Sequence, residues 1–290
     1  MSGLTLQADE WSVSIRPECG GSLASLVRGE VDVLRPMPAQ SASPLESACF
    51  PLVPYCNRIA DGRFRWKGDE IALPRNFSPE VHSLHGIGWQ NKWRVASADS
   101  WRCTLIHDYA GLGTRPWKRP IRQWPWAYRA EQRIRLGERG VKITLDITNL
   151  SNVPMPAGLG LHPYFRRRAE TRVHFSANGM VRTEKGIPVG DFVPADTFAD
   201  WSQGTLLPDT LVDHCFVDWS GEVRITDDLG TITMRAHGAP HLHCFAPPRA
   251  PDLCFEPVTH IPDALNQDPA GMVSLPPGCT ASMQMEITAS

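Results

Sequence analysis

Apolar and polar residues alternate with a period of two along several segments of this chain. The clearest segment is 130–150, "AEQRIRLGERGVKITLDITNL", which alternates on both sides of the turn-forming residues GERG. Because a two-residue period places successive side chains on opposite faces of a strand, the segment predicts a hairpin with one solvated face. Segments 222–236 and 22–36 repeat the arrangement around DDLG and RGE. The buried face of the first hairpin would carry Val141, Ile143, Leu145 and Ile147.

No long stretch shows the 3.6-residue period of an amphipathic helix. The best helix candidate is 43–55, "SPLESACFPLVPY", which Pro51 and Pro54 interrupt. The coarse pattern is therefore all-β, without an internal boundary. Because an antiparallel sheet needs a second layer over its apolar face, we expect a large antiparallel β-sandwich in a single domain, residues 1–290. Inward side chains two residues apart would line an open groove on one sheet.

Composition changes this picture little. The 290 residues include 26 prolines and 23 glycines, spread along the chain, which favours short strands joined by turns. The formal net charge is −2. Nucleic-acid and membrane-surface binding both favour a basic face, so we expect neither kind of partner. Two local basic runs, 115–122 and 166–168, are either solvated loops or contacts to an anionic substrate.

The cysteines and histidines bear on location and on metals. The 8 cysteines contain no CxxC pair, which argues against zinc-ribbon and thioredoxin-like motifs. The N-terminal residues show no basic start followed by an apolar run, and no apolar stretch reaches about 18 residues. We therefore expect a cytoplasmic protein whose thiols are reduced and mostly pack in the core. His241 and His243 would share a strand face that suits zinc or copper, but no third ligand is evident, so we predict no metal.

Five segments place polar residues in strand-like or turn-like contexts. They are NRIADGRF (57–64), LHGIGW (84–89), GLGLHPYF (158–165), DHCF (213–216) and FEPVTHIPDALN (255–266). Their order resembles the aldose 1-epimerase (galactose mutarotase) family, and the resemblance extends from about residue 15 to residue 285. Each motif alone is a weak signal, whereas all of them in this order on an all-β background are specific. The resemblance implies a large antiparallel sandwich with an open groove on one sheet.

The resemblance also implies roles for individual residues. Glu256 of FEP would be the general base, and His162 of HPYF would be the general acid. The sugar hydroxyls would be held by Arg58, His85, Asp213 and Asn57. Asp209 and Asp218 are nearby alternatives to Asp213, and His162 could instead be a packed core histidine. The aromatic residues that could flank the site are Trp89, Trp93, Tyr164 and Phe165.

The chemistry explains why these residue types are needed. An aldopyranose interconverts its anomers when a base removes the proton of the C1 hydroxyl and an acid protonates the ring oxygen. The aldehyde then rotates, and the ring closes on its other face. A carboxylate whose pKa burial raises suits the first role, and an imidazole suits the second. We expect Glu256 and His162 to act from opposite sides of one pyranose. No step transfers electrons, so we expect no cofactor.

The predicted function is therefore an aldose 1-epimerase that acts on a free aldohexose, with a monosaccharide as its partner and a monomer or homodimer as its state. One alternative is a hexose-6-phosphate 1-epimerase. By resemblance, that branch tends to carry an arginine shortly after the HG of the second motif, whereas here HGIGWQNKW has none before Arg94. Arg122 or the 166–168 run could substitute. The other alternative is a carbohydrate-binding or sensor protein without catalysis, which would not need a matched acid and base.

Overall fold

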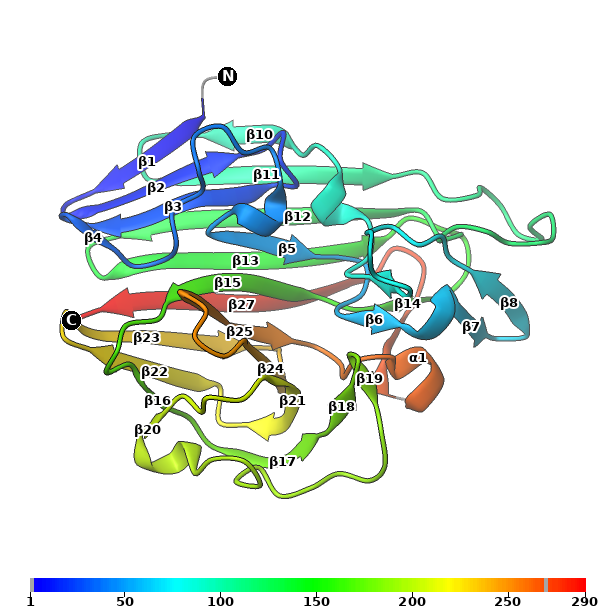
Figure 1. Cartoon of the computed structure of the whole chain (residues 1–290). Helices are drawn as coiled ribbons and strands as arrows, with labels where there is room; N and C mark the ends of the chain where they lie inside the picture. Colours follow the sequence, from blue (N-terminus) through cyan, green and yellow to red (C-terminus); the bar gives the residue numbers. More distant parts are fainter. Residues whose placement is uncertain (1–2, 269–270) are drawn as a thin grey trace.

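Two large antiparallel sheets form the body of the protein in a computed structural model that describes residues 3–268 and 271–290 (Figure 1). Both sheets are built from strands that are far apart in the sequence. The first sheet has the order β1 (Leu4–Ala8), β2 (Trp11–Arg16), β3 (Ser22–Arg28), β5 (Cys49–Leu52), β15 (Gly160–Arg166), β25 (Asp252–Val258), β24 (His241–Ala246), β21 (Val212–Trp219) and β17 (Ala177–Val181), with β4 (Val31–Asp32) paired to β3.

The second sheet covers the inner face of the first. Its order is β10 (Arg94–Ala98), β11 (Arg102–Tyr109), β12 (Tyr128–Gly137), β13 (Gly140–Asn149), β27 (Thr280–Ala289), β23 (Gly230–His237), β22 (Glu222–Asp227), β16 (Arg172–His174) and β20 (Thr205–Leu206). The expected all-β fold with a large antiparallel sandwich is thus confirmed.

Short paired strands gather at one end of the sandwich, on the right in Figure 1. These pairs are β6 (Arg58–Ile59) with β9 (Ser83–Leu84), β7 (Arg63–Trp66) with β8 (Asp69–Ala72), β14 (Met155–Ala157) with β26 (Val273–Leu275), and β18 (Thr183–Glu184) with β19 (Ile187–Pro188). Helix α1 (Ala264–Gln267) lies beside them. Single 3₁₀ turns occur at Pro44–Glu46, Ala60–Gly62, Gly88–Gln90 and Trp201–Gln203.

The hairpins predicted from alternation are confirmed. Segment 130–150 forms β12 and β13, and the side chains of Val141, Ile143, Leu145 and Ile147 are all buried. Segment 222–236 forms β22 and β23, and segment 22–36 contains β3 and the short β4. The helix candidate 43–55 does not form an α-helix: its first residues make one 3₁₀ turn, and residues 49–52 become β5. Pairing of β5 with β15 overrides the weak helical pattern there.

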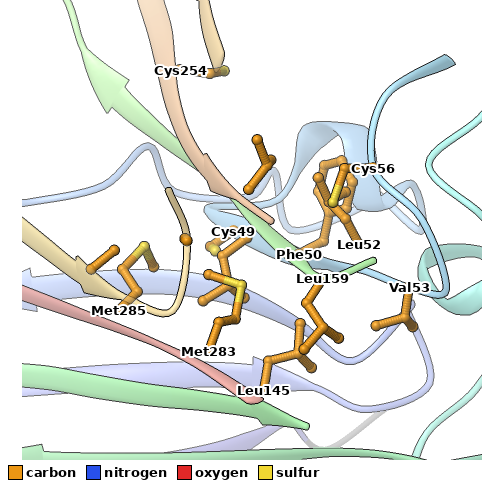
Figure 2. Packing of buried hydrophobic residues seen from close by; sticks show 14 of the residues in the cluster. Cys49, Phe50, Leu52, Val53, Cys56, Leu145, Leu159, Cys254, Met283 and Met285 are labelled. Carbon is orange, nitrogen blue, oxygen red and sulfur yellow. The ribbon is translucent and has the colours of Figure 1, made fainter. Parts of the chain in front are cut away.

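The core fills the space between the two sheets. Figure 2 shows Leu145 and Met283 of the second sheet gathered with Cys49 and Leu159 in one buried cluster. The cysteines are unpaired thiols; all are buried except Cys279, which agrees with the packing role predicted for most of them. Within the described residues, no helix has the length and apolar character needed to span a bilayer.

Candidate active site

Three neighbouring strands of the first sheet place their polar side chains in one row. Strands β15 and β25 are antiparallel in a register that pairs Gly160 with Val258, so His162 and Glu256, two residues further in, lie directly opposite each other. Strand β24 pairs with β25 on its other side, where His243 lies opposite Glu256. Side chains in register on adjacent strands share a face. The sheet therefore presents His162, Glu256 and His243 side by side (strands in Figure 1).

A short strand pair supplies the opposite wall of the site. Arg58 lies on β6, which pairs with β9, and His85 follows β9 directly. Asn57 and His85 both have left-handed backbones, with φ of 54° and 57°, and their main chains hydrogen-bond to each other. Gly86 is also left-handed, and a Cβ there would overlap the carbonyl oxygen of Val53. This explains why glycine follows the histidine of LHG.

All of the residues predicted for the site line one cavity. Its volume is about 290 Å³. Its lining comprises Leu45, Asn57, Arg58, Phe77, Leu84, His85, His162, Tyr164, Asp213, His243, Phe245 and Glu256. A cavity at the lower end of the usual ligand range of roughly 300–1,000 Å³ suits a ligand of monosaccharide size. The lining combines polar side chains with the aromatic rings of Phe77, Tyr164 and Phe245, which match the hydroxyls and the apolar ring face of a sugar.

His162 contacts Glu256 directly. The imidazole Nε2 lies 3.2 Å from Oε1 of Glu256, and the ring packs against the neighbouring rings of Phe50 and Tyr164, with centroids 4.6 and 4.7 Å away. Burial, and then the positive charge of His243, lower the pKa of His162 to about 3. The aromatic rings of Phe50 and Tyr164 favour the charged form of His162 and so act to raise its pKa, because aromatic faces attract cations. The expectation that base and acid lie on opposite sides of the sugar is wrong, since the two groups are adjacent.

Glu256 is a buried carboxyl group with an elevated pKa. Its side chain is 2% exposed, and Oε2 has no hydrogen-bond partner in the described part of the chain. Burial raises the pKa of Glu256 to about 7. The adjacent Phe255 does not cover this carboxyl group, because strand alternation points Phe255 into the core between the sheets. The loops that cover the outer face of the sheet bury the carboxyl group instead.

The other charged groups in the cavity are paired. Nε of Arg58 donates to Glu80 at 2.7 Å, and Nε2 of His243 lies 2.8 Å from Oδ1 of Asp213. Burial alone would raise the pKa of Asp213, but the hydrogen bond and charge of His243 hold it below its usual value. Asp213 is thus an ionised acceptor with one oxygen engaged and one oxygen available to a ligand hydroxyl.

His85, His162 and Glu256 come close enough to suggest a metal centre, because they offer ligand atoms within 4.8 Å of one another. The hydrogen bonds argue against one. The backbone amide of Asn57 donates to Nδ1 of His85 at 3.0 Å. The proton of this neutral imidazole must therefore lie on Nε2, which leaves no lone pair there for a metal. His85 is better suited to donate to a ligand hydroxyl.

The sequence analysis missed His243, Phe77 and Phe245 as cavity residues. The spacing of His241 and His243 already indicated a shared strand face, but it was interpreted only as a metal pair, and the same spacing extends to Phe245. In the structure His243 turns to Asp213, whereas His241 lines a separate cavity. Of the aromatic residues proposed to flank the site, only Tyr164 lines it. The others are buried elsewhere: Trp89, Trp93 and Phe165.

Both basic runs lie outside this cavity. Arg115 and Arg119 each pair with Asp69 at 2.7 Å, and Arg168 pairs with Asp227 at 2.6 Å. None of the arginines in the two runs lines the cavity. The structure therefore favours the interpretation of these runs as ion-paired surface segments.

A sandwich of two large antiparallel sheets, with a carboxyl–imidazole pair in a small polar cavity, is a galactose mutarotase-like fold. The model of the aldose 1-epimerase family matches residues 3–288, and the chain belongs to this family. An uncharacterized protein of Escherichia coli K12, YphB, is 29% identical over 283 residues, which are 92% of this chain and 92% of YphB.

Solved structures agree with this assignment. The crystal structure of a proposed aldose 1-epimerase from E. coli K12 has a TM-score of 0.87 and 28% identity, covering 100% of this chain and 99% of the other. A galactose mutarotase-like protein from Clostridium acetobutylicum has a TM-score of 0.84 at 19% identity, covering 99% and 94%. At this lower identity the likeness concerns the fold alone.

Proposed function

We propose that this protein catalyses the interconversion of the α and β anomers of a free aldohexose. The observation that carries the proposal is the contact between Nε2 of His162 and Oε1 of Glu256 in the floor of the cavity. The C1 hydroxyl oxygen and the ring oxygen of a pyranose are bonded to the same carbon. A base and an acid that serve these two atoms must therefore be neighbours, as these two groups are.

In the proposed reaction the two side chains exchange one proton with the sugar. Burial leaves the proton of the resting pair on Glu256, so this proton first passes to His162 across their 3.2 Å contact. Glu256, now the carboxylate, accepts the proton of the C1 hydroxyl, while His162, now the imidazolium, donates to the ring oxygen and the ring opens. After rotation about C1–C2 the aldehyde presents its other face. Glu256 then returns its proton to O1, and His162 removes the proton from O5. Each positioned proton-transfer group typically contributes about 10²–10⁴-fold to such a rate.

The remaining polar side chains would hold the sugar. We assign Arg58 and the Nε2–H group of His85 as donors to ring hydroxyls, and Asp213 as an acceptor. Asn57 lines the cavity, but its Oδ1 accepts from the backbone amide of Arg58, and its Nδ2 lies 3.3 Å from His243. Asn57 therefore holds Arg58 and His243 in place, in addition to contacting the ligand.

The charges favour a free sugar over a hexose phosphate. A phosphate needs an uncommitted cation, usually an arginine fork. The two cationic groups in the lining are Arg58 and His243, and each is already paired with a carboxylate. Arg94, the first arginine after the second motif, lies on the exposed β10 of the other sheet beside Asp108.

Polarimetry tests the proposal. Freshly dissolved α-glucose, α-galactose and glucose 6-phosphate are followed with wild-type protein, with Glu256→Gln and without protein. We expect acceleration with at least one free hexose, little with the phosphate, and a loss of about 10²–10⁴-fold in the variant. Acceleration only with the phosphate would replace the substrate assignment. No acceleration with any sugar, together with protection against heat by a sugar, would indicate a binding protein instead.

A further inference from the structure

His243 is a buried histidine in the cavity that the acid–base scheme leaves without a role. It lies on β24, directly opposite Glu256 on β25 and Cys215 on β21, and its side chain is 3% exposed. Its neighbour on the same strand face, His241, lines a different cavity. His243 is therefore a second imidazole in the row of side chains that contains His162 and Glu256.

The hydrogen bond to Asp213 fixes the position of one proton of His243, whereas Nδ1 has no hydrogen-bond partner in the described part of the chain. Nε2 is 2.8 Å from Oδ1 of Asp213, and a carboxylate only accepts, so Nε2 carries a proton. Asn57 cannot serve as its acceptor, because Oδ1 of Asn57 accepts from the backbone amide of Arg58 and turns the amide nitrogen toward His243. Burial alone would lower the pKa of His243. Asp213, Cys215 and the carboxylate of Glu256 outweigh burial and raise it to about 10.

The surrounding charges show what this cation balances. The groups that face His243 are Asp213 and Cys215 from β21, Glu256 from β25, Arg58 from β6, His85 after β9 and His162 from β15. Arg58 pairs with Glu80, and His243 pairs with Asp213. Glu256 and His162 form the other pair of ionisable groups nearby. The positive charge of His243 lowers the pKa of both.

We propose that His243 is a positioning residue for catalysis: it keeps a fixed positive charge beside the Glu256–His162 pair and so sets the upper end of the pH range in which the reaction runs. This inference rests on the proposed function. Ring opening needs one proton on the pair, in the form with Glu256 ionised and His162 charged. A neighbouring cation disfavours that proton on either residue. Removal of the cation should therefore let the pair keep its proton to higher pH.

The test replaces His243 by glutamine, which keeps an N–H donor for Asp213 and cannot carry a charge. The rate of mutarotation, as kcat/KM, is measured from pH 5 to pH 10. We expect the alkaline limb of His243→Gln to move up by about one pH unit, because a nearby charge typically shifts a pKa by that much or more. We expect the rate on the acid side of this limb to change much less. The matched control is His241→Gln, which removes an imidazole from the same strand face and should leave the profile unchanged.

An alkaline limb at the wild-type pH in His243→Gln, or an equal shift in His241→Gln, would overturn the inference. Wild-type protein that accelerates no sugar would instead refute the proposed function. A second measurement does not need turnover or the variant. In the ¹⁵N NMR spectrum of the wild-type histidines at pH 8, both ring nitrogens of His243 should be protonated. A neutral ring there would refute the fixed charge.

Discussion

Replacing Glu256 by glutamine should stabilise the folded protein in mild alkali while it removes activity. The side chain is buried, and burial raises its pKa from 4.5 to about 7. Glutamine has nearly the same shape and retains one carbonyl oxygen, but it cannot ionise. The substitution thus removes the free-energy cost of ionising a buried carboxyl group in the cavity and keeps the shape of the side chain.

The magnitude follows from the two pKa values. Between pH 4.5 and about 7 the folded state keeps a proton that the unfolded chain releases, so stability falls as the pH rises through this window. One pKa unit corresponds to about 1.4 kcal/mol. Integration across the shift gives a loss of about 3 kcal/mol at pH 8 and about 1 kcal/mol at pH 5, which the variant escapes. The variant should therefore gain about 2 kcal/mol more at pH 8 than at pH 5.

Urea unfolding at the two pH values, followed by tryptophan fluorescence, measures this difference. Subtracting wild type from variant at each pH cancels the titration of the groups that do not interact with Glu256. Glu138→Gln is the control, because it removes the same charge from an exposed turn and should give little dependence on pH. An equal change in stability at pH 5 and pH 8 for Glu256→Gln would show that the carboxyl group is not desolvated as the structure indicates.

Three further substitutions test how the site is built. Arg58→Ala should raise KM for the sugar about tenfold or more with a smaller effect on kcat, since it removes a charged donor; unchanged KM in steady-state kinetics would refute the binding role. Gly186→Ala should raise KM in the same direction, because a Cβ there would overlap the guanidinium group of Arg58. Gly190→Ala has the same left-handed backbone with open space around it and is the control; equal KM values in the two variants would count against this contact. Gly86→Ala should lower the free energy of unfolding by about 1–3 kcal/mol through backbone strain and overlap with the main chain of Val53, and a denaturation midpoint equal to that of wild type would contradict this.

Alternation along the sequence predicted those strands that have one solvated face. Segment 130–150 is the clearest example, because β12 and β13 bury one row of side chains and expose much of the other. Strand β25 has no such pattern, since nearly all of its residues are buried. A central strand that is covered by the second sheet on one face and by loops on the other carries no period of two. The motif FEP identified this strand, whereas its hydrophobic pattern could not.

The site was predictable in its members but not in its arrangement. The motif order indicated Glu256 and His162, and the structure brings both into one cavity. Their direct contact depends on the register of β15 against β25, which no local pattern specifies. The place of His243 depends in the same way on which strands flank β24. The prediction that residues 1–290 form one domain and the roles assigned to the site residues stay predictions.

The paired charges of the cavity also bear on which substrates can react. In the proposed reaction, a neutral hexose would leave the total charge unchanged while one proton moves from its C1 oxygen to its ring oxygen through Glu256 and His162. A phosphate would add negative charge beside a carboxyl group whose pKa burial already raises to about 7. Like charges raise that pKa further, so less of the base would be ionised when the substrate is bound. Arg58 pairs with Glu80, and His243 pairs with Asp213. Binding a phosphate would therefore require one of these ion pairs to break. Under the proposed function, this electrostatic balance would favour an uncharged sugar. A single cationic substitution in the cavity lining, Phe77→Arg, should then improve binding of glucose 6-phosphate more than that of glucose.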